Sequence, residues 1–408
     1  MKNIIVAQSG GPTTAINASL VGVVKGALSS GGYDKVFGAL YGISGVMKEE
    51  FIQLEGLSDE ELGRIYTTPS SYLGSCRYKM PDIDEDPSIY EKIFEILNKY
   101  EVAAFFYIGG NDSMDTISKL AEYGSSIGSD IRFAGVPKTI DNDLVHIDHT
   151  PGYGSAAKFI IASMLEFAHD TSVYKVPTVT IIEIMGRNAG WLTAAAALAR
   201  NEYSDIPQLI YLPEVPFSTE NFLNDVKDVL KTTNNVVIAV SEGLQDENGV
   251  YLSATSAAED KFGHAQLSGV GKILESLVKD ELGVKCRSVE INILQRCAAH
   301  MASASDLQES ELLGEKAVEY ATAGKTGYMT TIIRTSNEPY EYKIETAELD
   351  GIANQVKQVP IEWINPSRND VTSEMIDYVR PLVCGEVQLE YKDGVPVYAD
   401  ISHLTGTV

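Results

Sequence analysis

Short apolar segments alternate along this chain with segments whose apolar residues recur at helical spacing. Each apolar segment has the length of a β-strand and ends at a glycine or a polar turn. An alternation of strand and helix is typical of parallel sheets, because a crossover helix must return the chain to the same edge. We therefore predict strands at residues 3–8, 102–108, 132–136, 177–184, 236–240 and 288–293.

Residues 88–99 illustrate the helical segments. Their apolar side chains fall on one face and their charged side chains lie mostly opposite, which predicts an amphipathic helix that covers a sheet. The apolar face consists of Ile89, Ile93, Phe94, Ile96 and Leu97. The predicted fold class is α/β, with two doubly wound βαβ lobes and mostly parallel sheets.

Composition limits the class of protein. The chain has 408 residues, of which 44% are hydrophobic and 22% charged, so it is long enough for two packed lobes. Its formal net charge of −25 argues against nucleic acid or an anionic membrane as a partner, because both require clustered lysine and arginine. An anionic substrate would need a locally basic pocket.

The cysteines and the apolar segments bear on location. Four cysteines show no paired spacing, and the N-terminal residues contain no apolar stretch of the signal-peptide type. Apolar stretches are interrupted well before the roughly 20 residues that a membrane span requires. We therefore expect a cytoplasmic protein without a transmembrane helix. The acidic residues 82–86 are expected to form a solvated loop.

Two glycine turns follow predicted strands. Ser9-Gly10-Gly11 precedes a helix expected from about Ala15, and such a turn lets backbone N–H groups approach an anion, although it also serves as a purely structural turn. Residues 109–113, Gly-Gly-Asn-Asp-Ser, repeat this arrangement. The alternative for the second turn is helix capping, since Asn, Asp and Ser are preferred cap residues.

A third loop, at residues 137–143, combines a cation with two carboxylates. Lys138 directly follows a predicted strand, and Asp141 and Asp143 are two residues apart. This combination suits proton abstraction and polyphosphate binding. The alternative is a solvated acidic turn.

Seven motifs in order give the chain a resemblance to the phosphofructokinase family over roughly residues 1–310. They are Ser-Gly-Gly (9–11), Leu-Gly-Ser-Cys-Arg (73–77), Gly-Gly-Asn-Asp-Ser (109–113), Pro-Lys-Thr-Ile-Asp-Asn-Asp (137–143), Met-Gly-Arg (185–187), Ser-Glu-Gly (241–243) and Gln-Arg (295–296). The resemblance implies a donor lobe of residues 1–150 plus about 295–350 and a sugar-phosphate lobe of residues 151–294 plus the C-terminal tail. Residues 311–408 are expected to be partly an extension of unknown role.

The resemblance implies a reversible reaction of glycolysis and gluconeogenesis. A phosphoryl group would pass from inorganic diphosphate to the C1 hydroxyl of fructose 6-phosphate, giving fructose 1,6-bisphosphate and phosphate, with Mg²⁺ as cofactor. Asp141 would be the general base, assisted by Lys138, Asp112 and Arg187. Family arginines at the Arg287 position reach across a subunit interface, which implies a homodimer or homotetramer.

The implied binding residues form three sets. Diphosphate would be bound by Gly10, Gly11, Arg77, Gly110, Asn111, Asp112, Ser113 and Lys138. The sugar phosphate would be bound by Thr139, Asp141, Asp143, Met185, Gly186, Arg187, Glu242, Arg287 and Arg296, whose arginines offer forked donors to phosphate. The metal would be held by Asn111 and Asp112. For each arginine taken singly, the alternative is a surface or interface salt bridge.

Charge and size determine the expected donor. ATP-using relatives have glycine where Asp112 and Lys138 stand, and members with Asp and Lys use diphosphate. A carboxylate about 4 Å from an α-phosphate would repel it by about 4 kcal/mol per unit charge at an effective dielectric near 20, roughly a thousandfold in affinity. Diphosphate has no third phosphate to meet Asp112, while Lys138 can neutralise the transferring group. Thr116 adds bulk where ATP-using relatives keep glycine beside the adenine.

The chain departs from the family pattern at three positions. Asn111 replaces the usual metal-binding aspartate, and an amide is a weaker Mg²⁺ ligand than a carboxylate. Thr178 replaces a second sugar-phosphate arginine, for which Lys175 could substitute. Ile293 stands where an aromatic residue or histidine is expected. A different sugar phosphate, such as a seven-carbon ketose, therefore stays open as the acceptor.

Three alternative functions also stay open. An ATP-dependent phosphofructokinase would change little when Asp112 and Lys138 are replaced by glycine. An enzyme resembling NAD kinases shares a Gly-Gly-Asp type of loop but is disfavoured by residues 137–143 and 185–187. A catalytically silent sugar-phosphate-binding subunit is suggested by Asn111 and disfavoured by an intact Asp141, since a sensor needs no base.

Overall fold

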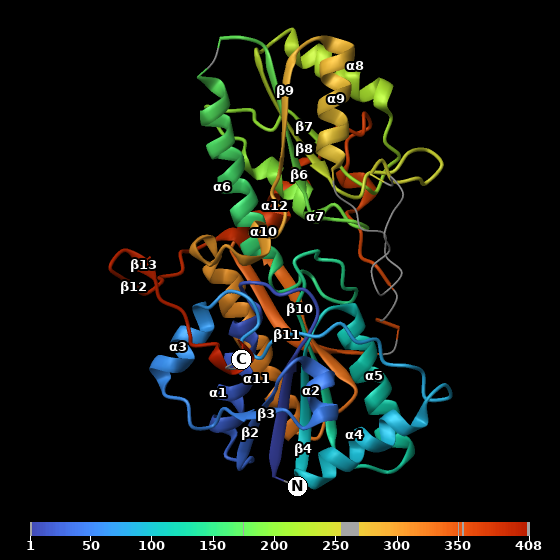
Figure 1. Ribbon diagram of the computed structural model, residues 1–408, viewed down its shortest axis with the longest axis vertical. Coiled ribbons are helices and arrows are strands. Elements are labelled where there is room, and N and C mark those ends of the chain that lie inside the picture. The colour runs from blue at the N-terminus through green and yellow to red at the C-terminus, as the bar shows by residue number, and fades with distance from the viewer. Residues whose placement is uncertain (1, 174, 254–268, 350, 353–354, 406–408) are drawn as a thin grey trace.

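Two sheets organise the chain. The computed structural model describes residues 2–173, 175–253, 269–349, 351–352 and 355–405. The larger sheet has seven strands in the order β11-β10-β5-β4-β1-β2-β3 and lies in the lower half of Figure 1. Neighbours among β2, β1, β4, β5 and β10 are parallel, while the edge strands β3 and β11 are antiparallel. The strands are β1 (Asn3–Gln8), β2 (Lys35–Ala39), β3 (Phe51–Gln53), β4 (Val102–Gly109), β5 (Arg132–Pro137), β10 (Tyr328–Asn337) and β11 (Tyr340–Glu348).

Helices cover the larger sheet, and we call this unit the larger lobe (Figure 1). Local sequence explains where two of them begin. The carboxylate of Asp86 accepts the N–H of Ser88 and Pro87 stands in the first turn of α4, while Ser58 and Glu61 form a capping box at α3. The helices are α1 (Ile16–Ser30), α2 (Gly42–Lys48), α3 (Asp59–Thr67), α4 (Pro87–Lys99), α5 (Asn111–Ser126) and α11 (Ala304–Thr322).

The smaller sheet has four parallel strands in the order β7-β8-β6-β9. Alternate residues of β8 enter two different apolar cores, one on each face of the sheet, which is why the strand reads as a continuous apolar run. We call this sheet and its helices the smaller lobe. Its strands are β6 (Thr178–Ile184), β7 (Leu209–Tyr211), β8 (Asn235–Ser241) and β9 (Lys285–Glu290).

Helices of the smaller lobe come from the middle of the chain and from its C-terminal third. The α-helices are α6 (Tyr153–Ser172), α7 (Trp191–Ala195), α8 (Thr219–Leu230), α9 (Val270–Leu282), α10 (Leu294–Cys297) and α12 (Ser373–Val379). The 3₁₀ helices are η1 (Ala196–Ala199), η2 (Ala299–Met301), η3 (Ile361–Trp363) and η4 (Arg380–Val383).

The C-terminal residues return to the larger lobe. After α12 the chain forms a short antiparallel hairpin and then a last helical turn beside the loop that follows α3 (Figure 1). These elements are β12 (Tyr391–Lys392), β13 (Val395–Pro396) and α13 (Ser402–Thr405). Residues beyond 311 therefore contribute to both lobes, since α11, β10 and β11 complete the larger one.

Five of the six predicted strands are confirmed, with every boundary within one residue of its prediction, and the predicted helix at 88–99 is α4. The prediction for 288–293 is partly wrong, because the strand is β9 (Lys285–Glu290). Because β9 is an edge strand that pairs with β6 alone, it accommodates the charged residues Lys285 and Arg287 and lacks a continuous apolar run. Asn292, with a φ of 50°, turns the chain before α10.

A buried polar cluster lies where the two lobes meet. The ring of His149 contacts the carboxylates of Asp148 and Glu309, each at 2.7 Å, and Arg334 pairs with Asp148 at 2.8 Å. Burial alone would lower the pKa of His149, but the two carboxylates outweigh it and raise the pKa to about 9. The cluster ties α11 and β10 to the segment that follows β5.

Membrane insertion finds no support in the helices that the structure describes, none of which is long and apolar enough to span a bilayer.

Candidate active site

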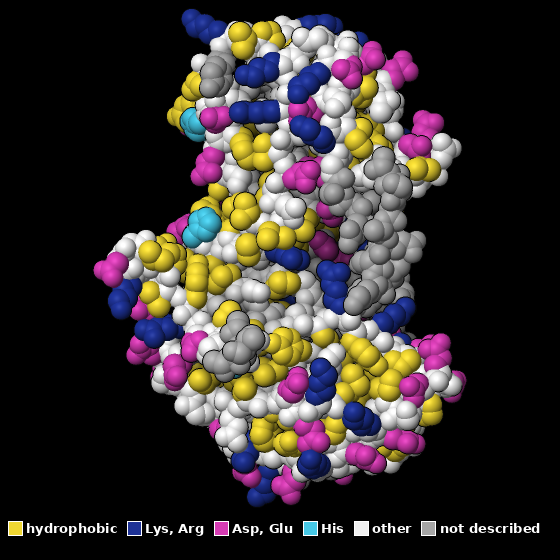
Figure 2. Space-filling view, viewed as in Figure 1, with side chains coloured by type: hydrophobic (Ala, Val, Ile, Leu, Met, Phe, Trp, Pro, Cys, Tyr) yellow, Lys and Arg dark blue, Asp and Glu magenta, His cyan; other side chains and the backbone are white. Residues whose placement is uncertain are grey.

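A cavity of about 620 Å³ lies between the lobes, at the carboxyl ends of β1, β4, β5, β6 and β8. Loops at the carboxyl ends of parallel strands are where doubly wound folds bind ligands. Figure 2 shows lysine and arginine side chains at the waist between the two lobes. The lining residues include Gly10, Gly11, Arg77, Gly110, Asn111, Asp112, Ser113, Lys138, Thr139, Asp141, Asp143, Met185, Arg187, Glu242 and Arg296. The structure thus brings together nearly all of the residues selected from the sequence.

The two glycine turns are held against each other. The hydroxyls of Ser9 and Ser113 are 2.5 Å apart, which ties the turn after β1 to the turn after β4. A Cβ at Gly109 would lie 1.9 Å from Oγ of Ser113, so only glycine fits there. Gly10 has a φ of 77°, a left-handed conformation that favours glycine. Both turns therefore present backbone to the cavity.

The side chains of Asn111 and Asp112 do not cap α5. Its N-cap is Gly110, without a side-chain hydrogen bond, so the capping alternative for this loop is wrong. Nδ2 of Asn111 donates to Asp143 at 3.3 Å, and Oδ1 of Asn111 is buried without a partner among the described residues. Asp112 is exposed and lines the cavity. Both residues line the cavity.

Lys138 is buried beneath the first glycine turn. Its Nζ donates to the carbonyl of Gly11 at 2.6 Å, and the side chain is 2% exposed. Burial lowers the pKa of Lys138 to about 8, against the raising effect of the nearby Asp141 and Asp143 carboxylates. The solvated-turn alternative for residues 137–143 therefore does not describe this lysine.

Asp141 reaches the cavity from a position surrounded by protein. Burial raises the pKa of Asp141 above its ordinary value, although three cations oppose the shift, namely Lys138, Arg187 and Arg296. The pKa of Asp143 is raised to about 7, by burial and by the charge of Asp141. Carboxyl groups with raised pKa values are better proton acceptors than ordinary aspartates.

The smaller lobe supplies the opposite wall. Met185 and Arg187 follow β6, and the N–H of Gly186 donates to the carboxylate of Glu242 at 3.4 Å. Burial raises the pKa of Glu242 to about 7. Nε of Arg187 is buried and has no hydrogen-bond partner among the described residues, so this donor is left unsatisfied.

Arg296 links the two walls. It lies on α10 of the smaller lobe, yet its Nη1 is 3.5 Å from where a Cβ would stand on Gly11 of the larger lobe. The neighbouring Gln295 accepts the N–H of Met185 at 3.3 Å and so joins α10 to the loop after β6. An anion between the lobes would contact groups from both.

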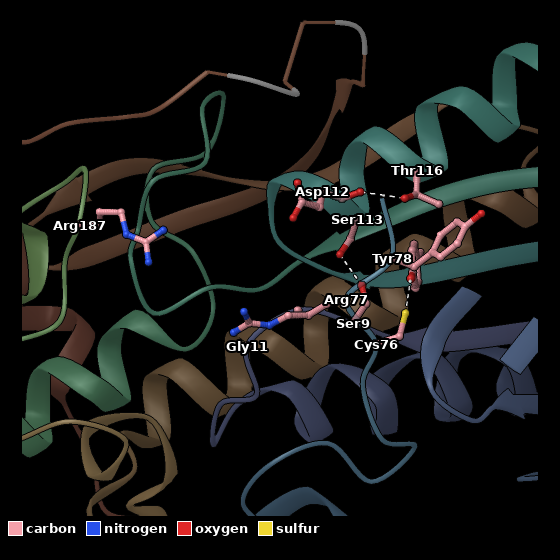
Figure 3. Close-up of a pocket in the computed structure, with 11 residues that line it drawn as sticks. Ser9, Gly11, Cys76, Arg77, Tyr78, Asp112, Ser113, Thr116 and Arg187 are labelled. Carbon is pink, nitrogen blue, oxygen red and sulfur yellow. Dashed lines mark hydrogen bonds between the residues drawn. The ribbon is translucent and has the colours of Figure 1, made fainter. Parts of the chain in front are cut away.

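A smaller cavity of about 220 Å³ adjoins the first, and Figure 3 shows it. Arg77 extends from its loop toward the side on which Arg187 enters (Figure 3). Thr116 is buried on α5, and its hydroxyl donates to the carbonyl of Asp112 at 2.9 Å. Cys76 and Tyr107 also line this cavity, with Sγ of Cys76 3.8 Å from the phenolic oxygen of Tyr107.

Arg287 is not brought into the cavity by its own chain. It lies on the edge strand β9 and donates to Asp170 at 2.6 Å, with about half of its side chain exposed. It shares a separate crevice with Thr178 and Lys285. Lys175 lines neither cavity.

Sequence reasoning missed a segment that follows β11. Gln355 and Val356 line the cavity, and the next residue, Lys357, binds the loop that carries the carboxylates. Its N–H donates to the carbonyl of Asp143 at 2.8 Å and its Nζ donates to the carbonyl of Asp148 at 2.7 Å. Burial lowers the pKa of Lys357 to about 8. No motif marks this lysine in the sequence.

Sequence reasoning also missed cations at the mouth of the cavity. Lys119 pairs with Asp115 at 2.9 Å and with Asp82 at 2.8 Å, and Lys79 lines the cavity nearby. Asp82 belongs to the loop predicted to be solvated, and its side chain is 70% exposed. The spacing of Asp115 and Lys119, four residues apart on α5, was the available signal.

Comparisons with known proteins identify relatives over almost the whole chain. The family model described as phosphofructokinase matches residues 3–321. The pyrophosphate--fructose 6-phosphate 1-phosphotransferase of Xanthomonas campestris pv. campestris (strain B100) is 39% identical over 98% of this chain and 96% of that protein. The protein of the same name from Rhodospirillum rubrum is 40% identical over 93% and 94%. The crystal structure of a pyrophosphate-dependent phosphofructokinase from Marinobacter aquaeolei has 37% identity and a TM-score of 0.88, covering 98% and 96%.

Proposed function

The chain belongs to the phosphofructokinase family, and from this premise we infer that it moves a phosphoryl group from inorganic diphosphate to the C1 hydroxyl of fructose 6-phosphate. The products are fructose 1,6-bisphosphate and phosphate, and the step is reversible. The choice of donor rests on one observation, which is that an exposed Asp112 and a buried Lys138 line the same cavity.

We propose that the larger lobe binds diphosphate and that the smaller lobe binds the sugar phosphate. The glycine turns at Gly10 and Gly110 offer backbone to one phosphate, and Arg77 and Lys138 offer positive charge. Lys138 supports the transferring phosphoryl group, since a buried cation stabilises charge more strongly than an exposed one. Asp112 would repel a third phosphate and so disfavours ATP.

Asp141 is proposed as the general base. It takes the proton from the C1 hydroxyl as that oxygen attacks phosphorus in line with the departing phosphate. Arg187, whose Nε has no partner among the described residues, stabilises the equatorial oxygens. Met185, Glu242 and Arg296 position the sugar phosphate between the lobes.

Mg²⁺ is the proposed cofactor, and the donor set fits it. Among the described residues no group of three His, Cys, Asp or Glu side chains could hold a metal by itself. Magnesium is typically bound by one or two protein oxygens together with substrate phosphates. Asn111 and Asp112 would hold the magnesium ion together with diphosphate. Nδ2 of Asn111 donates to Asp143, and Oδ1 of Asn111 has no hydrogen-bond partner among the described residues. When bound, the ion neutralises phosphate charge.

We further propose a homodimer or homotetramer in which Arg287 serves the neighbouring subunit. Arg287 projects from an edge strand and does not line its own chain's cavity. An exposed edge strand is a surface on which another copy can pack.

The experiment that tests the function compares diphosphate with ATP. Turnover of fructose 6-phosphate is measured with Mg²⁺ and each donor, for the wild-type chain, Asp141→Asn and the double variant Asp112→Gly/Lys138→Gly. We expect the wild type to use diphosphate only, Asp141→Asn to lose about 10²–10⁴-fold in kcat, and the double variant to lose diphosphate activity. Wild-type turnover with ATP would contradict the donor assignment, and Asp84→Asn in the exposed acidic loop is the matched control.

A further inference from the structure

We propose that residues 398–404, called here the C-terminal strap, position residues 72–77, called here the arginine loop, and thereby set the affinity for diphosphate. The inference rests on the proposed function, because the arginine loop carries the proposed donor-binding Arg77. The strap itself lines neither cavity. Its residues would therefore act as positioning residues.

The arginine loop has no regular secondary structure and depends on side chains for its shape. The N–H of Tyr72 donates to Asn17 at 2.8 Å, and the N–H of Leu73 donates to Gln8 at 2.9 Å. At its other end, the hydroxyl of Ser75 donates to the carbonyl of Gly10 at 2.6 Å. A displacement of the loop would therefore move both Arg77 and the first glycine turn.

The strap contacts the first half of this loop. Nε2 of His403 lies 2.7 Å from the carbonyl oxygen of Tyr72, and the two rings are 4.7 Å apart. The hydroxyl of Tyr41 donates to the carbonyl of Leu404 at 2.5 Å, and the N–H of Tyr41 donates to Leu73 at 2.8 Å. Tyr41 thus bridges the strap to the loop.

Leu404 also packs over the loop at Gly74. Its Cδ2 lies 3.2 Å from where a Cβ would stand on Gly74, whose φ is 71°. The strap is held at its other end by the N–H of Ala399, which donates to Thr68 at 2.8 Å. Because Arg77 follows Gly74 by three residues, the strap restrains the segment from which Arg77 projects.

The location of the strap contacts predicts an effect on the binding of one substrate only. Each of the strap contacts described above is made with the larger lobe, whereas Met185, Glu242 and Arg296 belong to elements of the smaller lobe. Weakening the strap should therefore lower the affinity for diphosphate and leave that for fructose 6-phosphate unchanged. A general loss of stability would instead affect both substrates.

The kinetic test uses the double variant His403→Ala/Leu404→Ala. We expect the KM for diphosphate to rise about tenfold, because the variant loses the hydrogen bond of His403 and the packing of Leu404 over Gly74, while the KM for fructose 6-phosphate stays unchanged. His403→Gln retains an N–H donor and should recover most of the affinity. Val395→Ala, on the 64% exposed side chain of the neighbouring hairpin, is the matched control. Equal changes in both KM values, or none, would overturn the proposal.

A second readout is independent of catalysis. Hydrogen exchange at the amides of Tyr72 and Leu73 should be about tenfold faster in the double variant than in the wild type or in Val395→Ala. Unchanged exchange would overturn the positioning role even if activity falls. Faster exchange in a chain that does not turn over diphosphate would instead retain the positioning role and refute the proposed donor.

Discussion

Lys138 combines two properties that rarely occur in one lysine. It is buried, and its Nζ donates a hydrogen bond to the carbonyl of Gly11 in the glycine turn that faces the cavity. Burial lowers the pKa of Lys138 to about 8, so its charge changes in a range accessible to kinetics. Its proposed role in binding diphosphate depends on the ammonium form, since a neutral amine would not offset phosphate charge.

We therefore expect kcat/KM for diphosphate to fall as the pH rises through about 8, because this parameter reports the free enzyme and Lys138 loses its proton there. In Lys138→Arg the alkaline limb should move to higher pH, since a guanidinium stays protonated. The measurement is the pH profile of kcat/KM. Lys119→Arg, at the mouth of the same cavity, is the control that should leave the limb in place. An unmoved limb in Lys138→Arg would assign it to another group, such as Lys357.

At the residue scale, the sequence predicted only those site residues that belong to recognisable motifs. Asp141, Arg187 and Glu242 stand at the ends of strands, so their approach to one another follows from the parallel topology. Lys357 could not be found in this way. Lys357 lies in the connection between β11 and α12. Neither the periodicity of apolar residues nor the spacing of motifs predicts where such a connection runs.

At the element scale, α1 and α11 pack closely against each other. A Cβ on Gly22 would lie 2.0 Å from the carbonyl oxygen of Glu311, and one on Gly314 would lie 2.3 Å from the carbonyl oxygen of Ser19. The two helix backbones therefore approach at a distance that only glycine permits. This contact matters to the site because α1 begins just after the first glycine turn.

Gly22→Ala should destabilise the protein by about 3 kcal/mol, because the new methyl group meets backbone that cannot move aside. Gly63, exposed on α3 with no atom within 4 Å of an added Cβ, is the matched control. Gly63→Ala should stabilise by about 0.5–1 kcal/mol, since alanine favours helix over glycine. Denaturant midpoints of the two variants give the comparison, and equal shifts would contradict the packing argument.

The cluster around His149 makes the junction between elements sensitive to pH. Its pKa in the folded protein, about 9, lies above the ordinary value of 6.5. The resulting stabilisation is fully present below pH 6.5 and is lost as the pH rises through 9, by about 3 kcal/mol at most. The groups responsible are the carboxylates of Glu309 and Asp148.

Glu309→Gln should therefore reduce the decrease in unfolding free energy between pH 6.5 and pH 9. The pKa values of Lys138 and Lys357 are lowered to about 8 in the folded protein, so these two groups increase the free energy of unfolding as the pH rises above 8. They do so equally in the wild type and the variant, so the difference between the two isolates His149. Urea titrations at the two pH values provide the data, with Glu319→Gln on the exposed face of α11 as control. Identical pH dependence in all three chains would rule out the cluster as the cause.

For the whole molecule, the strand pattern predicted two βαβ lobes, and the structure contains two sheets of that kind. The path of the C-terminal third could not be derived from strand and helix patterns, and only the family resemblance assigned residues of about 295–350 to the donor lobe. Its strands β10 and β11 complete the larger sheet, α12 packs on the smaller lobe, and the strap returns to the larger lobe. Each of these contacts joins residues far apart in the sequence. The periodicity of apolar residues predicts which face of a helix or strand is buried, but it does not predict which other element packs against that face.

A single chain also leaves the proposed site without Arg287, which projects from β9 beside Asp170. If Arg287 serves the neighbouring subunit, then a site consists of Asp141 from one chain and Arg287 from another. Asp141→Ala and Arg287→Ala homo-oligomers would each lack one of the two groups at every site. A mixed dimer would contain one site with both groups intact and one with neither.

Refolding an equal mixture of Asp141→Ala and Arg287→Ala chains should therefore restore about a quarter of wild-type activity with limiting fructose 6-phosphate, since about half of randomly formed dimers are mixed. Each variant refolded alone should stay far below this level. Asp141→Ala mixed with Asp141→Ala/Arg287→Ala is the matched control, because none of its sites has an intact Asp141. Activity no greater than the sum of the separate variants would show that Arg287 does not act across an interface. Size-exclusion chromatography of the same mixtures confirms that oligomers have formed, so that a failure to assemble is not mistaken for a failure to complement.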